Sequence, residues 1–167
     1  MRYFIGLGAN VGDRLTNLRE AVQRLDALGT IAARSRVYAA SAVGGPPQGP
    51  YLNAAIALDC DLEPLALLTR IQEIETALGR NRANEVRWGP RTLDVDILMA
   101  GTRGELIIDE PVLRIPHPRM KERGFALAPL CDLDATLMHP ELGRTLKALI
   151  SAAHADGQAW APTGDAL

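Results

Sequence analysis

Two carboxylates, Asp94 and Asp96, stand one residue apart in a stretch where acidic and apolar side chains alternate. This alternation is typical of a β-strand, in which every second side chain lies on the same face. The two Cα atoms would then lie roughly 6.6 Å apart, close enough for the negative charges to repel each other. One interpretation is a site for one or two divalent cations, which prefer carboxylate oxygens. The alternative is that both residues form the solvated face of a half-buried strand.

A basic stretch precedes the two carboxylates. Four arginines fall within twelve residues there, opposed only by Glu85, and they are Arg80, Arg82, Arg87 and Arg91. Arginine suits phosphate oxygens because its planar guanidinium donates paired hydrogen bonds. The turn-forming dipeptide Gly89-Pro90 would fix the directions of Trp88 and Arg91. Together with the carboxylates, these residues predict a site for a metal ion and a nucleotide.

Two further polar residues each have a structural and a functional interpretation. His117 lies between Pro116 and Pro118, which hold the backbone extended, and it adjoins a second basic cluster within residues 114–123. A lone histidine in such a place can be structural or can contact a ligand. Asn53 interrupts an apolar segment, which costs free energy unless its amide is hydrogen-bonded. Its partner would be either a neighbouring loop or a planar heterocycle.

The overall composition narrows the class of protein. The chain has 18 basic and 20 acidic side chains and a net charge of −2, which offers no general attraction for nucleic acid or an anionic membrane. Neither a signal peptide nor a membrane-spanning stretch is indicated. The two cysteines, Cys60 and Cys131, lie in apolar contexts and are expected to be free thiols, as in a reducing compartment. We therefore predict a cytoplasmic monomer that binds small molecules, with no nucleic-acid or membrane partner.

The elements that would position these residues follow a regular order. Hydrophobic periodicity and turn signals predict strand 3–8, helix 14–28, strand 31–40, strand 51–60, helix 64–78 and strand 93–98. Asp13 is predicted to cap the first helix and Gly29 to end it. The order predicts an α+β fold with a ferredoxin-like βαββαβ core. Two helices would pack on one face of an antiparallel sheet, and the opposite face would be left for a ligand.

The pattern of apolar residues also predicts the buried face of the second helix and the elements of the C-terminal part. The buried stripe of the second helix is predicted to be Leu65, Leu68, Ile71, Ile74 and Leu78, with Gln72 and Glu75 off the stripe. Residues 106–108 are predicted to pair with the Asp94 strand as a hairpin, and residues 144–154 have a helical period. We expect a single domain over residues 1–167, in which a core of residues 3–133 is followed by a C-terminal extension, residues 134–167.

Five segments of the chain resemble the 6-hydroxymethyl-7,8-dihydropterin pyrophosphokinase family, and they occur in the family's order. The most specific is Arg-Trp-Gly-Pro-Arg-Thr-Leu-Asp-Val-Asp-Ile at residues 87–97, which is similar to the family's signature nearly residue for residue. The others are Gly8-Ala9-Asn10, Tyr51 to Ala54, Gly79 to Arg82, and Pro116 to Met120 with Arg123-Gly124-Phe125. The resemblance covers residues 3 to about 133. Loop 41–50 departs from it, because Ala40-Ser41 stands in place of the family's Thr-Pro pair.

The resemblance implies an enzyme of folate biosynthesis that transfers pyrophosphate from ATP to 6-hydroxymethyl-7,8-dihydropterin and releases AMP. It implies that Asp94 and Asp96 hold two Mg²⁺ ions at the ATP phosphates, and that Arg80 and Arg91 share the catalytic role with them. The residues that it places at the nucleotide are Gln72, Glu75, Arg82, Arg87, Trp88, Arg91, His117 and Arg123. The residues that it places at the pterin are Val43, Tyr51, Asn53, Asp94 and Phe125, with the ring stacked between Tyr51 and Phe125.

Two other functions fit parts of the same pattern. A metal-nucleotide binding module with little turnover would bind ATP without making product. An RNA-binding module can share a ferredoxin-like fold, but it carries aromatic residues on its sheet and a broad basic surface. Aromatic residues make up only 4% of this chain. Asp96 is a candidate general base for the transfer reaction. The competing explanation needs no base, because a metal ion would make the attacking alcohol more acidic.

Overall fold

The computed structural model describes residues 1–167 and contains one large antiparallel sheet. Its strands lie in the order β10-β3-β4-β1-β5, and β2 also pairs with β4. All the neighbouring strands run antiparallel. Their bounds are β1 Arg2–Ala9, β2 Thr30–Arg34, β3 Tyr38–Ala40, β4 Tyr51–Asp59, β5 Asp94–Ala100 and β10 Trp160–Pro162. The predicted α+β class with an antiparallel sheet is confirmed.

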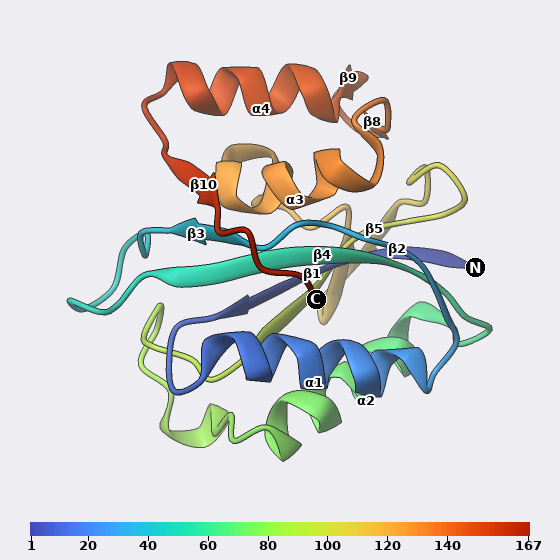
Figure 1. The fold of residues 1–167 in the computed structure, drawn as a ribbon. Coiled ribbons are helices and arrows are strands. Elements are labelled where there is room, and N and C mark those ends of the chain that lie inside the picture. Colours follow the sequence, from blue (N-terminus) through green and yellow to red (C-terminus); the bar gives the residue numbers. More distant parts are fainter.

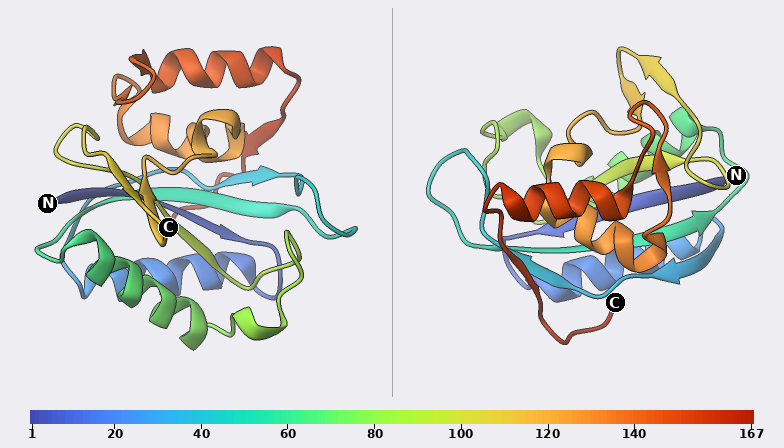
Figure 2. Two further views of the ribbon diagram at one scale, coloured as in Figure 1. Left: turned by 180° about the vertical axis from the view of Figure 1, so that it is seen from behind. Right: turned by 90° about the horizontal axis from the view of Figure 1, so that it is seen from above.

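Helices cover both faces of this sheet (Figure 1). Helices α1 (Arg14–Asp26) and α2 (Pro64–Ala77) pack on one face, as predicted. On the opposite face lies α3 (Gly124–Asp134), and α4 (Leu146–Ala155) packs on α3 (Figure 2). The expectation that this opposite face is left for a ligand was therefore wrong for the part under α3. None of the helices combines the length and the apolar character needed to cross a membrane.

The core consists of two apolar clusters, one on each side of the sheet. The cluster under α1 and α2 includes the fully buried residues Ile5 and Ile56, and the cluster under α3 includes Phe4 and Ala57. Successive residues of β1 and β4 thus contribute to opposite clusters, as the period of two requires. Because both faces are covered, these strands are apolar along almost their whole length. This rigid platform carries the polar residues at the open end of the sheet.

The first predicted helix and the second predicted strand differ from the structure in their limits. The Asp13 side chain accepts a hydrogen bond from the Thr16 backbone N–H at 3.1 Å, which confirms the cap, but α1 ends at Asp26, before Gly29. The predicted strand 31–40 is broken into β2 and β3. The break occurs where the Ser35 hydroxyl accepts a hydrogen bond from the Ala55 N–H at 2.8 Å, replacing a backbone acceptor of the ladder.

The buried stripe of α2 also differs from the prediction. Pro64 opens the helix and Gly79 follows it with φ +89°, as the residue types indicate. Leu65 is 44% exposed, however, whereas Leu67 and Glu75 are fully buried. Ile71 and Ile74 are buried as predicted, and the burial of Glu75 is tolerable because its carboxylate contacts Arg80 and Arg82.

The predicted pairing of residues 106–108 with the Asp94 strand is confirmed only at Leu106, whose N–H donates a hydrogen bond to the Ala100 carbonyl of β5 at 2.9 Å. Strand β6 (Ile108–Glu110) pairs instead with β7 (Leu113–Ile115). The Leu98 carbonyl of β5 accepts a hydrogen bond from the His117 N–H at 2.8 Å, so the segment at His117 occupies the free edge of β5.

A small hairpin of β8 (Met138–His139) and β9 (Arg144–Thr145) precedes α4. Two short 3-10 helices, η1 (Arg82–Asn84) and η2 (Met120–Glu122), lie in the loops.

Candidate active site

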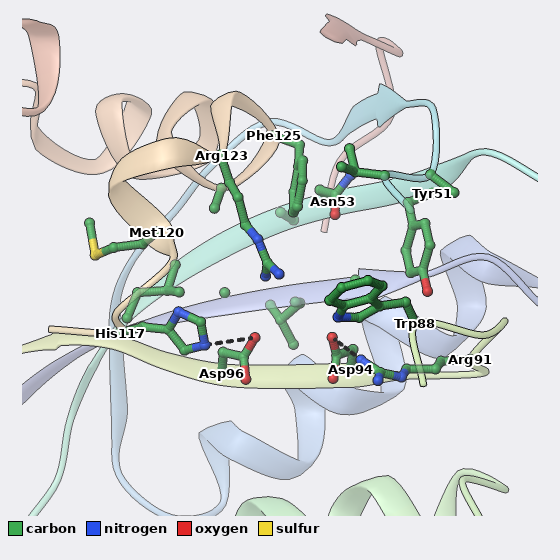
Figure 3. Close-up of a pocket in the computed structure, with 18 of the residues that line it drawn as sticks. Tyr51, Asn53, Trp88, Arg91, Asp94, Asp96, His117, Met120, Arg123 and Phe125 are labelled. Atoms are coloured by element: carbon green, nitrogen blue, oxygen red, sulfur yellow. Dashed lines mark hydrogen bonds and ion pairs between the residues drawn. The ribbon is translucent and has the colours of Figure 1, made fainter. Parts of the chain in front are cut away.

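A cavity lies above the uncovered part of the sheet, and three neighbouring strands form its floor (Figure 3). Asn53 of β4, Gly8 of β1 and Asp94 of β5 are cross-strand neighbours in one row. Adjacent strands are about 4.8 Å apart, so the Cα atoms of Asn53 and Asp94 lie roughly 10 Å from each other. A Cβ atom at Gly8 would come within 3.3 Å of the Asn53 side-chain oxygen. The glycine therefore leaves space for a ligand between the amide and the carboxylate.

Three segments far apart in the sequence form the walls of the cavity. Loop 41–50, the arginine-rich loop and the stretch before and at the start of α3 supply the predicted residues Val43, Trp88, Arg91, His117, Arg123 and Phe125. The first two segments touch each other, since Gln48 Nε2 donates a hydrogen bond to the Trp88 carbonyl at 2.7 Å. The side chains of Arg123 and Phe125 point from α3 toward the sheet (Figure 3). The walls and the floor together bring ten of the predicted residues around one space.

Asp94 is fixed by two arginines. Its Oδ1 atom lies 2.6 Å from Arg80 Nη1, and its Oδ2 atom lies 2.9 Å from Arg91 Nη1. The backbone of Arg91 is held in turn by Asn10, whose side-chain oxygen accepts a hydrogen bond from the Arg91 N–H at 2.8 Å. The Asp94 side chain is 25% exposed toward the cavity. It is a carboxylate with a defined orientation and a neutralised charge.

Asp96 has a very different environment. No arginine or lysine lies within ion-pair distance, and its only ionisable neighbour in reach is His117, whose Nε2 atom is 4.0 Å from Oδ2. Desolvation at the cavity floor raises the pKa of Asp96 to about 7, and the negative charges of Asp94 and Glu75 add to the shift. The side chain is still 39% exposed, so water and ions reach it. Asp96 is therefore a carboxylate that lacks a positive partner.

The residues present fit a magnesium site that is completed by a ligand. Magnesium prefers oxygen donors, and proteins often bind it through one or two carboxylates together with substrate phosphates and water. Asp94 and Asp96 supply such oxygens on one face of β5. The chain contains no cluster of three or more His, Cys, Asp or Glu side chains that could hold a metal. Additional ligands would thus come from phosphate oxygens and water.

Arg80 does not line the cavity, although the resemblance places it at the phosphates. Its side chain is 4% exposed and lies under β5, between three carboxylates. The distances are 2.5 Å to Glu75 Oε1, 2.5 Å to Glu85 Oε1 and 2.6 Å to Asp94 Oδ1. In this arrangement Arg80 orients Asp94 from below.

Glu75 is the fully buried centre of the same network. Its Oε1 atom accepts hydrogen bonds from Arg80 and from the Val95 N–H at 2.8 Å, and its Oε2 atom contacts Arg82. Burial raises the pKa of Glu75, and the Arg80 cation opposes that shift. Gln72 is exposed on α2, and the exposed Arg87 lies over the Trp88 ring at 4.7 Å from its centroid. Five predicted site residues therefore stand outside the cavity lining, four predicted at the nucleotide and one predicted as catalytic: Gln72, Glu75, Arg82, Arg87 and Arg80.

Replacing Glu75 with Gln is expected to destabilise the protein by about 3 kcal/mol or more, because both fully buried Glu75 oxygens accept hydrogen bonds and the amide would turn an N–H toward one of these donors. Urea unfolding at neutral pH measures the effect. Glu73→Gln is the matched control on the same helix, since the Glu73 side chain is 57% exposed in a surface pair with Arg70. Its expected effect is below about 1 kcal/mol. Equal losses in the two variants would show that the buried network contributes no more than a surface pair.

One side of the cavity presents a guanidinium without a carboxylate partner and a histidine whose Nε2 atom faces Asp96 at 4.0 Å. Arg123 is half-buried and no carboxylate lies within 4.0 Å of it. Burial lowers the pKa of Arg123, and the nearby Arg119 cation adds to the effect. His117 Nδ1 accepts a hydrogen bond from the Arg119 N–H at 3.2 Å, which leaves the ring proton on Nε2, facing Asp96. Burial lowers the pKa of His117 as well, so the ring is neutral near pH 7.

The other side of the cavity suits a planar, hydrogen-bonding ligand. Asn53 is 6% exposed, and its buried Nδ2 atom has no hydrogen-bond partner in the protein. The structural interpretation, a bond to a neighbouring loop, therefore does not apply to this atom. Tyr51 and Phe125 flank the amide from opposite elements (Figure 3). An unpaired buried donor next to two aromatic rings is a good complement to a polar heterocycle.

Some lining residues were not predicted from the sequence. They are mainly apolar or small and include Gly6, Gln48, Leu98, Met120 and Ala126. The period of two could have identified Leu98, because it shares a face with Asp94 and Asp96. Gly6 lies opposite Asp96 in the ladder. A Cβ atom added at Gly6 would come within 2.7 Å of Leu98 Cδ1. The sequence contains no comparable signal for Met120 or Ala126.

The fold and the site together place two carboxylates and an unpaired buried amide around one cavity, at the exposed end of an antiparallel sheet. The model of the 7,8-dihydro-6-hydroxymethylpterin-pyrophosphokinase (HPPK) family matches residues 4–135. This match covers well over half of the chain, and the chain belongs to that family.

Several relatives carry the same family name. A 2-amino-4-hydroxy-6-hydroxymethyldihydropteridine pyrophosphokinase of Bacillus subtilis is 46% identical over 132 residues, which cover 78% of this chain and 76% of the relative. The protein of that name from Pseudomonas aeruginosa is 38% identical and covers 93% of this chain and 94% of its own length. A folate synthesis bifunctional protein of Arabidopsis thaliana is 42% identical over 79% of this chain, which corresponds to only 27% of the larger protein.

Solved structures show the same fold at low sequence identity. The crystal structure of wild-type Plasmodium falciparum HPPK-DHPS with pterin and p-hydroxybenzoate matches 93% of this chain with a TM-score of 0.71 and 15% identity. Another crystal structure of an HPPK-DHPS, in complex with substrates, matches 90% of this chain with a TM-score of 0.69 and 12% identity. This chain spans less than half of each of those longer chains, 43% in both cases.

Proposed function

We propose that the protein transfers the pyrophosphoryl group of ATP to 6-hydroxymethyl-7,8-dihydropterin in folate biosynthesis, with AMP as the second product. The observation that carries this proposal is the single row of Asn53, Gly8 and Asp94 across the cavity floor. It puts an unpaired amide that suits a pterin roughly 10 Å from a carboxylate that suits a metal-bound phosphate. The family membership and the names of the relatives support the same reaction.

In this proposal, Asp94 and Asp96 would hold magnesium, with two ions as the expected number. The metal would neutralise charge on the ATP phosphates. Residues of the chain itself orient the carboxylate that would hold the metal. Arg80 and Arg91 fix the Asp94 carboxylate from both sides, and Arg91 also reaches the cavity. This arrangement makes Arg91 a candidate catalytic residue and Arg80 a positioning residue.

The pterin would bind with its polar edge at Asn53 and its ring between Tyr51 and Phe125. The hydroxymethyl oxygen would then attack the β-phosphorus of ATP. A new bond forms between that oxygen and the β-phosphorus, and the hydroxyl proton passes to Asp96 or to water. The bond from the β-phosphorus to the bridging α,β-oxygen breaks, so that AMP leaves. Little covalent chemistry falls to the protein, which aligns the two substrates and stabilises charge. The partner-free Arg123 and the neutral His117 are suitably placed for the phosphates.

Asn53→Ala is expected to weaken pterin binding by about tenfold or more, because a site built to hydrogen-bond a ligand loses its specific donor. ATP affinity is expected to change by less than about twofold, since the amide lies on the other side of the cavity. Isothermal titration with each ligand separately, in the presence of magnesium, measures both values. An equal loss for pterin and ATP would contradict the assignment of Asn53 to the pterin side.

The proposal also covers the topology of the sheet and the number of chains in the protein. We infer a ferredoxin-like core from β1, α1, the broken strand of β2 and β3, β4, α2 and β5, supported by the strand order β3-β4-β1-β5 and by α1 and α2 on the same face. We also infer a cytoplasmic monomer.

A further inference from the structure

The C-terminal segment from Gln158 to Pro162 touches two walls of the cavity without entering it. Strand β10 pairs with β3, with Trp160 opposite Ala40 and Pro162 opposite Tyr38. The chain runs from β3 directly into loop 41–50, which forms one wall. Figure 1 shows β10 between this strand and the first turn of α3, which carries the other wall. The segment lies beyond the residues that the family model matches.

Gln158 holds the peptide groups on both sides of Arg123. Its Oε1 atom accepts a hydrogen bond from the Gly124 N–H at 2.8 Å, and its Nε2 atom donates to the Glu122 carbonyl at 2.8 Å. The Gly124 N–H belongs to the first turn of α3, where a helix has no internal partner for its donors. No side chain of the local sequence caps this end of the helix. Gln158 therefore acts as the cap, from a distance of 34 residues along the chain.

Trp160 fixes the same turn by close packing. A Cβ atom at Gly124 would lie only 1.9 Å from Trp160 Cζ3, so the indole fits against a residue without a side chain. On its other side the indole stacks on His154 of α4, with 4.0 Å between the ring centroids. The segment is thereby anchored to α4, which in turn packs on α3.

The direction of the Arg123 side chain depends on this backbone anchoring. Arg123 has extended dihedral angles, φ −116° and ψ 100°, between η2 and α3. No carboxylate pairs with its guanidinium, and its aromatic contact is Phe125, whose centroid is 5.5 Å from Cζ. The two peptide groups held by Gln158 are the ones that set the direction of the Cα–Cβ bond toward the cavity.

We propose that Gln158 is a positioning residue that aims Arg123 at the transferred phosphates, and that Trp160 anchors the segment which carries it. The inference rests on the proposed pyrophosphoryl transfer, in which Arg123 contacts phosphate. A displacement of a contacting group by about an ångström can cost up to a hundredfold in rate. Loss of the Gln158 contacts is therefore expected to lower kcat by about tenfold.

The experiment is a double-mutant cycle on kcat with Gln158→Ala and Arg123→Ala. In the Arg123→Ala background, Gln158→Ala should lower kcat by less than about twofold, because the group that it positions is gone. Gln23→Ala is the matched control, since Gln23 is exposed on α1, in the other helical layer. It should retain wild-type kcat. Thermal melts of every variant establish that each is folded at the assay temperature.

The outcomes separate the positioning role from the function itself. An active wild-type protein with an unchanged kcat in Gln158→Ala would overturn the positioning role alone. A tenfold loss that persists in the Arg123→Ala background would also overturn it, because Gln158 would then act through general stability. A folded wild-type protein that makes no pterin pyrophosphate would overturn the proposed function and the positioning role with it.

Discussion

Asp96→Asn is expected to lower the rate of AMP formation by about a thousandfold while the protein stays folded. The substitution keeps the shape of the side chain and removes the charge that lacks a positive partner in the cavity. If Asp96 holds magnesium at the phosphates, an amide oxygen is a poor replacement, because it carries no negative charge for the cation. Initial rates at saturating ATP, pterin and magnesium measure the effect.

The same variant is expected to be more stable than the wild type in the absence of magnesium. The pKa of Asp96 is raised from 3.8 to about 7 in the folded protein, so the ionised carboxylate destabilises the fold as the pH rises through 7. At pH 8 the variant should gain about 1 kcal/mol, a value reduced for the exposure of the side chain. A loss of activity together with a rise in melting temperature is the signature of a functional carboxylate.

Asp61→Asn is the control for this substitution, since Asp61 is exposed in the turn before α2, far from the cavity lining. It should change neither the rate nor the melting temperature measurably. Near-normal turnover of Asp96→Asn in magnesium would remove the two-carboxylate site from the mechanism. A lower melting temperature at pH 8 would contradict the assignment of an uncompensated charge.

Arg91→Ala is expected to lower kcat by about a hundredfold to a thousandfold, with little change in pterin affinity. Arg91 reaches the cavity and holds Asp94 at 2.9 Å, whereas the pterin side of the cavity is built from Asn53 and the aromatic rings. Its backbone contacts with Asn10 do not involve the side chain, so the loop should keep its path. Steady-state kinetics and a pterin titration give the two values separately.

Arg103→Ala provides the matched control for the loss of a guanidinium, because Arg103 is exposed in a turn outside the cavity. It is expected to leave both values unchanged. Equal losses of kcat and pterin affinity in Arg91→Ala would indicate a collapsed loop and would contradict a role for Arg91 in the chemistry.

The carboxylate strand was predictable because its signal is local. Alternation alone placed Asp94 and Asp96 on one face of β5, and the structure confirms this arrangement. The arginine-rich loop was harder, because charge density does not reveal which charges pair with each other. Arg80 pairs with Glu75, five residues earlier, and the tertiary structure also brings Asp94 within 2.6 Å of it. Fewer arginines are therefore available to a ligand than the basic cluster in the sequence predicts.

The remaining differences come from contacts between distant parts of the chain. The break between β2 and β3 depends on a hydrogen bond from Ala55 to Ser35, and the edge of β5 is occupied by the segment at His117. The C-terminal strand β10 has no periodic signal, being only three residues long, and its position follows from Trp160 packing on Gly124. Such contacts decide which part of the sheet stays open, and local sequence patterns do not contain them.

The most direct test of the proposed function is an analysis of the products formed from ATP, magnesium and 6-hydroxymethyl-7,8-dihydropterin by ³¹P nuclear magnetic resonance. We expect AMP and a pterin pyrophosphate in equal amounts, with no ADP. Formation of ADP would place the attack on the γ-phosphorus and contradict the pyrophosphoryl transfer. Binding of ATP without any product would contradict it as well, and would favour a metal-nucleotide binding module.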